Sequence, residues 1–180
     1  AWVPINESWG VPNLQHSAPQ RDFLRGLYYM TKSLDSTRLV IDNDGWEHTE
    51  ATDLTTFHDY TGEGEKLGAK YQVIASDASQ MPDNHRKIFV KGVQYNHTPI
   101  VLTEYGGIAY VMPGKAKEKA GWGYTTATDE AAFLKRYRAL NEAIFANPAI
   151  VGFCYTQITD VEQEINGLMT YDRIPKVDPE

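Results

Sequence analysis

Short apolar runs alternate along this chain with longer segments of helical periodicity. The runs lie at Trp2–Ile5, Leu39–Ile41, Leu54–Phe57, Ile100–Thr103 and Ile150–Tyr155. Several of them are rich in β-branched residues and nearly continuous, which is typical of strands buried on both faces of a parallel sheet. The pattern predicts strands joined by helices.

The segment after the first run predicts a helix. Ser17 and Gln20 have the spacing of a capping box, and Pro19 falls in the first turn. Its apolar residues recur at helical spacing, at Phe23, Leu27, Met30 and Leu34. We expect these four side chains to form the buried face of the helix.

Two further helices are predicted. One is capped by Thr128, and its apolar face comprises Phe133, Tyr137, Leu140 and Ile144. The other runs from Glu63 to about Ala78, through Leu67, Tyr71 and Ile74. The stretch from Asp42 to Asp53 is too short and polar to predict a helix.

This alternation predicts an α/β fold, either an open doubly wound sheet or a (β/α)8 TIM barrel. Polar residues follow the strand ends, at Asn6-Glu7, Asp42–Asp44, His58–Tyr60, Glu104-Tyr105 and Gln157. Such residues are the active-site pattern of a barrel, and no glycine-rich nucleotide motif is present. A complete barrel has roughly 250 residues and eight strands, so 180 residues with five runs predict a partial barrel, folded as a single domain.

Composition narrows the possible partners and chemistry. The net charge of −7 comes from scattered residues and provides no basic patch for nucleic acid or a membrane surface. Cys154 is the only cysteine, which excludes an internal disulfide. The five histidines lack zinc-site spacing, and we predict no cofactor and no essential metal. Neither a membrane span nor a signal peptide is evident.

Glu7 and Glu104 each follow an apolar strand directly, where burying a charge is costly without a purpose or a partner. Either glutamate alone could simply cap a helix or pair with a lysine or arginine. Together they could supply the two carboxyl groups that cleave a glycosidic bond, one protonated and one ionised.

The motifs "NESWG", "DNDGWEH", "FHDYTG", "IVLTEYGG" and "YTQITDVEQEINGLMTYDR" jointly resemble glycoside hydrolase family 2. This family includes many bacterial β-galactosidases, β-glucuronidases and β-mannosidases. The resemblance runs from residue 2 to about residue 176 and implies that residues 1–180 are the C-terminal part of the catalytic barrel, roughly strands 4 to 8. The N-terminal barrel strands and the accessory β domains would lie outside this chain.

The resemblance also implies the roles of individual residues. Glu7 matches the family's acid/base and Glu104 its nucleophile, in a reaction that retains the anomeric configuration. Asn6 matches the residue that binds the sugar 2-hydroxyl. Tyr60 is the candidate hydrogen-bond donor to Glu104, and His58 is the second candidate.

Aromatic side chains offer flat platforms for sugar rings. Tyr155 stands where many relatives have tryptophan, so the sugar subsite is expected to differ here. The predicted substrate-binding residues are Asn6, Trp9, Asp44, Trp46, His58, Tyr60, Trp122 and Tyr155. Asp160, Glu162 and Glu164 are expected to belong to a loop braced by an Asn166-Gly167 turn.

The leading hypothesis is a retaining exo-glycosidase of the β-galactosidase kind that acts on a carbohydrate substrate. The alternatives are β-glucuronidase or β-mannosidase specificity, or a non-catalytic carbohydrate-binding remnant. The isolated 180 residues are expected to be inactive, with exposed barrel edges that favour association with a second copy. A bacterial cytoplasm or periplasm fits the sequence, with any targeting signal outside this chain.

Overall fold

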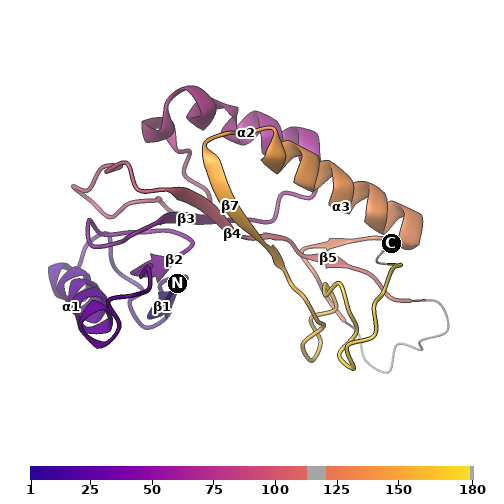
Figure 1. The fold of residues 1–180 in the computed structure, drawn as a ribbon, viewed down its shortest axis with the longest axis horizontal. Helices are drawn as coiled ribbons and strands as arrows, with labels where there is room; N and C mark the ends of the chain where they lie inside the picture. Colours follow the sequence, from indigo (N-terminus) through magenta and orange to yellow (C-terminus); the bar gives the residue numbers. More distant parts are fainter. Residues whose placement is uncertain (113–120, 179–180) are drawn as a thin grey trace. The chain divides into compact units, whose positions relative to one another are not determined.

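The computed structural model describes residues 1–112 and 121–178. Its helices are α1 (Ala18–Leu34), α2 (Gly64–Ser76) and α3 (Glu130–Phe145), with one 3-10 turn, η1 (Ala78–Gln80). Its strands are β1 (Ile5–Asn6), β2 (Asn43–Asp44), β3 (Thr55–Asp59), β4 (Ile100–Gly106), β5 (Ile108–Ala109), β6 (Thr125–Thr126) and β7 (Ile150–Thr156) (Figure 1).

The chain forms two compact units. Unit 1 comprises Ala1–His58, Lys70–Thr103 and Pro148–Phe153. Unit 2 comprises Asp59–Ala69, Glu104–Asn147 and Cys154–Glu180, of which residues 59–69, 104–112, 121–147 and 154–178 are described. Both units draw on β3, β4, β7 and α2, and the single domain expected from the sequence stays a prediction.

The strands confirm the predicted mixed α/β architecture with parallel pairing. β1 pairs with β2 in parallel, and so does β5 with β6. The order of the three-stranded sheet is β3-β4-β7. The first two predicted runs are mostly irregular. Regular pairing begins only at Ile5, the last residue of the first run, and at Asn43, two residues beyond the second. Within the runs, Trp2 and Val40 form an isolated parallel bridge.

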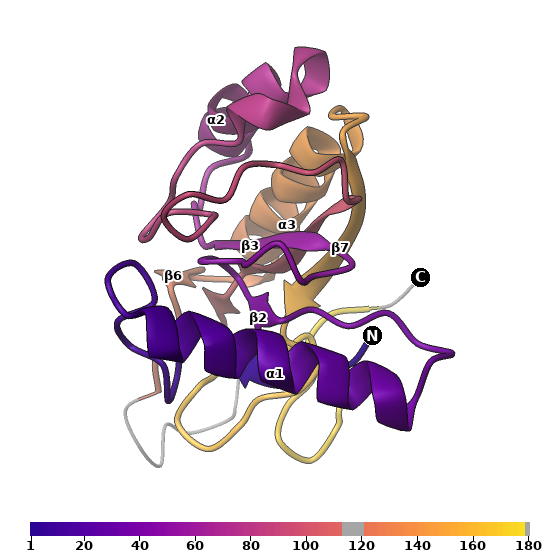
Figure 2. The same ribbon diagram turned by 90° about the vertical axis from the view of Figure 1, so that its left-hand side faces the viewer.

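Helix α1 begins where the sequence predicts, but it buries a different face. Ser17 is the N-cap, and its side chain accepts a hydrogen bond from the backbone N–H of Gln20. Leu24 is buried in a cluster with Val11, Leu14 and Val90, whereas the expected core residues Phe23, Met30 and Leu34 are 54%, 54% and 82% exposed. The predicted buried face is therefore wrong within this chain, because unit 1 covers the helix from the Leu24 side. Figure 1 and Figure 2 show α1 beside β2.

Helices α2 and α3 bury most of the predicted residues. Leu67, Tyr71 and Ile74 of α2 are buried, and so are Phe133, Leu140 and Ile144 of α3. Tyr137, also predicted for the face of α3, is half-buried. The N-cap of α3 is Asp129 and not Thr128, since the Asp129 carboxylate accepts a hydrogen bond from Ala132 N–H at 2.8 Å. The segment from residue 42 to 53 contains no helix, as expected.

Candidate active site

In unit 1, the first two strands bring predicted site residues into register. Asn6 pairs with Asp44 across the parallel β1–β2 ladder. Glu7 follows directly, and its backbone N–H donates to the Asp44 carbonyl at 2.9 Å. Glu7 and Ser8 then adopt left-handed conformations, with φ of 52° and 60°. Two such residues in succession are uncommon outside glycine and indicate a backbone held by its surroundings.

The side chains around Ser8 hold this turn. The Ser8 N–H donates to Asn43 Oδ1 at 2.8 Å, and the Ser8 hydroxyl donates to Glu47 Oε2 at 2.6 Å. Asn43 Nδ2 donates to the Ser8 hydroxyl at 3.0 Å, and Arg86 contacts the same Glu47 oxygen at 2.9 Å. Ser8, Asn43 and Glu47 are all buried. Their hydrogen bonds offset the backbone strain and fix the direction in which the Glu7 side chain leaves the strand.

The carboxyl group of Glu7 contacts a buried histidine. His58 Nδ1 lies 2.8 Å from Glu7 Oε1, and His58 Nε2 lies 3.4 Å from Asp44 Oδ2. The Thr103 hydroxyl donates to the other Asp44 oxygen at 2.6 Å. The ring of His58 packs on Gly45, where an added Cβ would come within 2.8 Å of Nδ1. Only glycine at position 45 leaves room for the imidazole in this position.

Asp44 is ionised in this arrangement. Burial raises the pKa of a carboxyl group, but the hydrogen bonds and charge from His58, together with the Thr103 hydroxyl, outweigh that effect and hold the pKa of Asp44 below its ordinary value. The ionised carboxylate therefore faces the imidazole, 3.4 Å from Nε2. The sequence predicts that Asp44 binds substrate, whereas the structure buries its side chain. The substrate-binding role stays a prediction.

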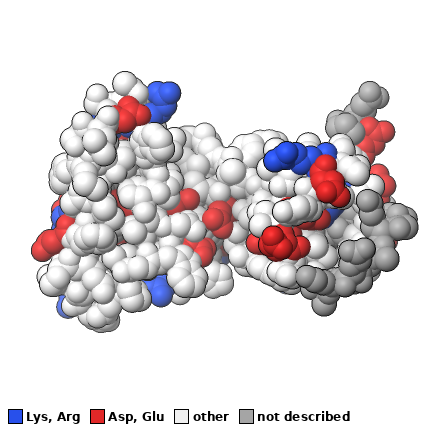
Figure 3. Space-filling model, turned by 90° about the horizontal axis from the view of Figure 1, so that it is seen from below, with Lys and Arg blue, Asp and Glu red and all other residues white. Residues whose placement is uncertain are grey.

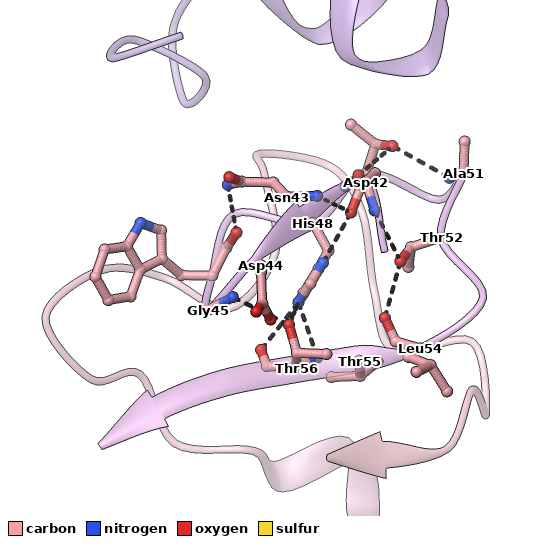
Figure 4. A network of polar contacts seen from close by, with 12 residues as sticks. Asp42, Asn43, Asp44, Gly45, His48, Ala51, Thr52, Leu54, Thr55 and Thr56 are labelled. Carbon is pink, nitrogen blue, oxygen red and sulfur yellow. Dashed lines mark hydrogen bonds and ion pairs between the residues drawn. The ribbon is translucent and has the colours of Figure 1, made fainter. Parts of the chain in front are cut away.

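A second buried network supports the loop that follows β2 (Figure 4). Asp42 and His48 are both fully buried, and Asp42 Oδ1 lies 2.8 Å from His48 Nδ1. The second Asp42 oxygen accepts from the backbone N–H and the hydroxyl of Thr49, at 2.7 and 2.8 Å. His48 Nε2 lies 2.9 Å from the Thr56 carbonyl oxygen on β3. These contacts tie the loop to β3.

The Asp42–His48 pair makes stability depend on pH. Burial by itself lowers the pKa of His48, but the hydrogen bond and charge of Asp42 outweigh burial and raise it above the ordinary value. The folded protein therefore binds this proton more tightly than the unfolded chain does. The stabilisation is complete below about pH 6.5, the ordinary histidine pKa. It is lost as the pH rises through the folded-state pKa.

We expect Asp42→Asn to destabilise unit 1 locally by about 3 kcal/mol, because it leaves His48 buried without its counter-charge. Amide hydrogen exchange over residues 42–56 measures this, and exchange should be roughly a hundredfold faster. The control is Asp22→Asn, since the Asp22 side chain is 71% exposed and pairs only at the surface of α1. Equal exchange in the two variants would contradict a stabilising role for the buried pair.

In unit 2, the second predicted carboxylate is also held by a hydrogen bond. The Tyr60 hydroxyl donates to Glu104 Oε2, as the sequence predicts for these residues. The Tyr60 ring stacks on Tyr124, with ring centroids 3.3 Å apart. At Gly107 (φ 55°) an added Cβ would lie 2.5 Å from Tyr124 and 2.9 Å from Tyr60. Glycine at this position therefore permits the stacked pair.

The hydroxyl of Tyr60 stays protonated at all ordinary pH values. Burial and the neighbouring Glu104 carboxylate both raise the pKa of Tyr60 far above its usual range. Tyr60 is therefore a donor to Glu104 and not a base.

The four predicted sugar platforms lie in different surroundings. Trp9 is 76% exposed and Trp122 is half-exposed, with its ring edge-on to Tyr124. Trp46 is buried edge-on against His58, and its indole N–H has no hydrogen-bond partner among the described residues. Tyr155 accepts a hydrogen bond from Ile108 N–H and donates one to the Asn166 carbonyl, both at 3.3 Å. These contacts favour packing for Trp46 and Tyr155, and the binding roles stay predictions.

The loop after β7 has the bracing role expected from the sequence, and it uses a lysine that the sequence did not single out. Lys176 is buried, and its ammonium group contacts Asp160 Oδ1 at 2.7 Å and the carbonyl oxygens of Tyr110 and Ile165 at 2.9 and 2.8 Å. Burial lowers the pKa of Lys176, partly offset by Asp160. Asn166 is buried and bonds to Glu164.

The described surface carries scattered charges. On the face shown in Figure 3, the Lys and Arg side chains of the described residues lie among uncharged surface and form no continuous basic patch. None of the helices within residues 1–112 and 121–178 has the length and apolar character needed to cross a membrane.

Solved structures share this fold. No family model and no curated protein sequence matches the chain. A β-glucuronidase of Faecalibacterium prausnitzii matches 92% of the chain with a TM-score of 0.59 and 19% identity. A β-glucuronidase of Ruminococcus gnavus matches 98% with a TM-score of 0.64 and 13% identity. A GH2 β-galacturonidase of Eisenbergiella tayi matches 91% with a TM-score of 0.57 and 16% identity.

The chain accounts for a limited part of each of these enzymes. It covers 28% of the F. prausnitzii protein, 30% of the R. gnavus protein and 29% of the E. tayi protein. The chain therefore shares its fold with one part of each of these enzymes, a mixed α/β arrangement with parallel strand pairs. The particular structures that it resembles are β-glucuronidases and a β-galacturonidase, including one described as GH2.

Proposed function

We propose that the chain is the part of a retaining β-glycoside hydrolase that carries both catalytic carboxyl groups. The observation that carries this proposal is that the two glutamates marked by the motifs each receive a hydrogen-bonding partner at a strand end. His58 contacts Glu7, and Tyr60 donates to Glu104. The fold shared with glycoside hydrolases over most of the chain supports this assignment.

The proposed reaction has two displacements. In the first, a Glu104 oxygen bonds to the anomeric carbon as the bond between that carbon and the leaving oxygen breaks. The leaving oxygen takes the proton of Glu7. In the second, Glu7 removes a proton from water, whose oxygen bonds to the anomeric carbon as the ester to Glu104 breaks. Two inversions retain the configuration. In such enzymes the two carboxyl groups lie roughly 5–5.5 Å apart, and we expect that separation here.

The complete fold is proposed to be a (β/α)8 barrel, with the described strands near its C-terminal half. The parallel β1–β2 and β5–β6 pairs support this, and so do the polar residues at or close to the C-terminal ends of β1, β2, β3 and β4. Asn6, beside Glu7, is proposed to bind the 2-hydroxyl of the sugar, and no cofactor or essential metal is proposed.

We propose β-linked uronides as the first substrates to test. The similar structures are named as β-glucuronidases and a β-galacturonidase, which favours a uronide over the β-galactoside that the sequence motifs suggested. A panel of aryl β-D-glycosides, comprising glucuronide, galacturonide, galactoside and mannoside, assayed with the full-length protein tests the choice. Preferred turnover of the galactoside would overturn the uronide proposal, and no turnover of any of them would overturn the glycosidase proposal.

The contact between Tyr60 and Glu104 gives a prediction for the nucleophile. Tyr60→Phe keeps the ring that stacks on Tyr124 but removes the donor to Glu104. We expect kcat to fall on the order of 100-fold, because one preorganised donor is lost where charge changes during the reaction. The control is Tyr171→Phe, an exposed tyrosine of unit 2. A kcat within a factor of about two of wild type for Tyr60→Phe would show that this donor has no part in catalysis.

A further inference from the structure

The contacts of His58 set it apart from a sugar-binding residue. Its side chain is 1% exposed. One ring nitrogen lies against the carboxyl of Glu7 and the other toward the carboxylate of Asp44. Its backbone carbonyl accepts a hydrogen bond from Asn84 Nδ2. A ring that is buried in this way and flanked by two acidic side chains acts through those side chains.

We propose that His58 is a positioning residue for Glu7, and that Asp44 in turn orients His58. The proposal rests on the acid/base role proposed for Glu7. It adds a chain of contacts, Thr103 to Asp44 to His58 to Glu7, that runs through unit 1 behind the reacting carboxyl group.

The geometry divides the two oxygens of Glu7 between different tasks. His58 contacts Oε1 at 2.8 Å, so Oε2 is the atom that gives and takes the proton. When Glu7 has lost its proton to the leaving group, the N–H at Nδ1 of His58 donates to the new carboxylate. The same donor holds the Oε1 carbonyl oxygen while Glu7 is protonated. One N–H therefore serves both states and keeps the carboxyl group in place.

Asp44 acts on the ring from the side opposite Glu7. Its carboxylate lies 3.4 Å from Nε2, while Nδ1 lies against Glu7. A flipped ring would place carbon atoms at both of these positions and lose both contacts. Asp44 thus favours the ring orientation that presents Nδ1 to Glu7.

The position of His58 depends on Gly45 and on β3. The ring occupies space that a Cβ at position 45 would fill, with contacts of 2.8 to 2.9 Å. Trp46 packs edge-on against the same ring, with centroids 5.7 Å apart. The imidazole is therefore confined, and its N–H direction is set before substrate binds, as preorganised catalysis requires.

Leaving-group dependence distinguishes this role from a purely structural one. Proton donation matters for an aryl glycoside with a poor leaving group, such as phenol, and hardly matters for 2,4-dinitrophenol. We expect His58→Leu to lower kcat/KM about 10- to 100-fold more on the phenyl glycoside than on the dinitrophenyl glycoside. His58→Asn, whose amide N–H can replace Nδ1, should recover most of that difference.

Three further variants complete the experiment in the full-length protein. Asp44→Asn should also lose more kcat/KM on the phenyl glycoside than on the dinitrophenyl glycoside. The difference should be smaller than for His58→Leu, because His58 remains. His16→Asn, at an exposed histidine, should change neither substrate. Azide should accelerate Glu7→Ala but not the His58 variants, since these retain the Glu7 carboxyl group.

The outcomes separate the two proposals. Equal losses on both glycosides in His58→Leu and Asp44→Asn, or no loss in either, would overturn the positioning role. If His58→Leu fails to fold, Asp44→Asn alone decides. If Glu7→Ala shows no leaving-group dependence, the acid/base assignment itself fails. If Glu7→Ala shows leaving-group dependence and neither His58→Leu nor Asp44→Asn does, only the positioning role fails.

Discussion

Replacing Glu104 by glutamine in the full-length protein is expected to lower kcat on an activated aryl β-glycoside by a factor on the order of 10⁴ or more. The amide has no charge with which to attack the anomeric carbon, and it cannot leave again in the second step. Stopped assays with the preferred glycoside of the panel measure the loss. Tyr60 should remain in place, because its hydroxyl can donate to the amide oxygen.

Added azide tests the same assignment through its product. In Glu104→Gly, azide can take the place of the carboxylate and attack from its side, which gives a glycosyl azide of inverted configuration. Glu63→Gln is the matched control, since the Glu63 side chain is 66% exposed and pairs with Lys66 at the surface of the protein. Near-wild-type turnover of the Glu104→Gln variant would disprove the nucleophile assignment.

Replacing Glu7 by alanine is expected to have a large effect that depends on the substrate. For a phenyl glycoside, kcat/KM should fall by about 10²- to 10⁴-fold, the usual contribution of general acid catalysis. For a dinitrophenyl glycoside the first step should be largely spared, so the glycosyl-enzyme accumulates and a burst of phenolate precedes slow turnover. Stopped-flow absorbance measures this burst.

Azide should also accelerate the Glu7→Ala variant, with the opposite stereochemistry. It attacks the glycosyl-enzyme where water would, needs no base, and gives a glycosyl azide of retained configuration. The control is Glu50→Gln, since the Glu50 side chain is 55% exposed and pairs with Arg25 at the surface of unit 1. A uniform loss on both substrates, without azide acceleration, would rule out the acid/base role of Glu7.

The helices and the strands of the three-stranded sheet could be predicted from local pattern. β3, β4 and β7 follow from runs of apolar residues, and α3 from the spacing of Phe133, Leu140 and Ile144. The face of α1 could not be predicted, because Phe23 and Leu24 are both apolar and periodicity alone does not say which side is covered. The cluster of Val11, Leu14 and Val90 covers Leu24. Val90 lies far from Leu24 in sequence, and Val11 and Leu14 lie in the loop before α1.

The candidate site was partly predictable. Strand-end position identifies Glu7, Glu104, His58 and Tyr60. The hydrogen bond from Tyr60 to Glu104 follows from their places directly after β3 and near the end of β4. The contact of His58 with Glu7 was not predicted, since alternation along a strand does not show which carboxylate a side chain reaches.

The supports behind the site were missed for a different reason. Ser8, Asn43 and Glu47 act through backbone and side-chain hydrogen bonds in a turn of left-handed residues. Their residue types are equally common in exposed loops. The polar run from Asp42 to Asp44 was the available signal, because three such residues directly after a buried strand are costly unless they are paired.

Gly45 gives the loop after β2 an influence on the proposed proton transfer, although it has no side chain. Because the His58 ring occupies the space beside it, any larger residue at position 45 would displace the imidazole and change how Glu7 is held. Under the acid/base role proposed for Glu7, a library that varies this single position would change activity while every ionisable group stays in the sequence. Among newly found sequences, glycine here is a simple marker for proteins that can use the same arrangement.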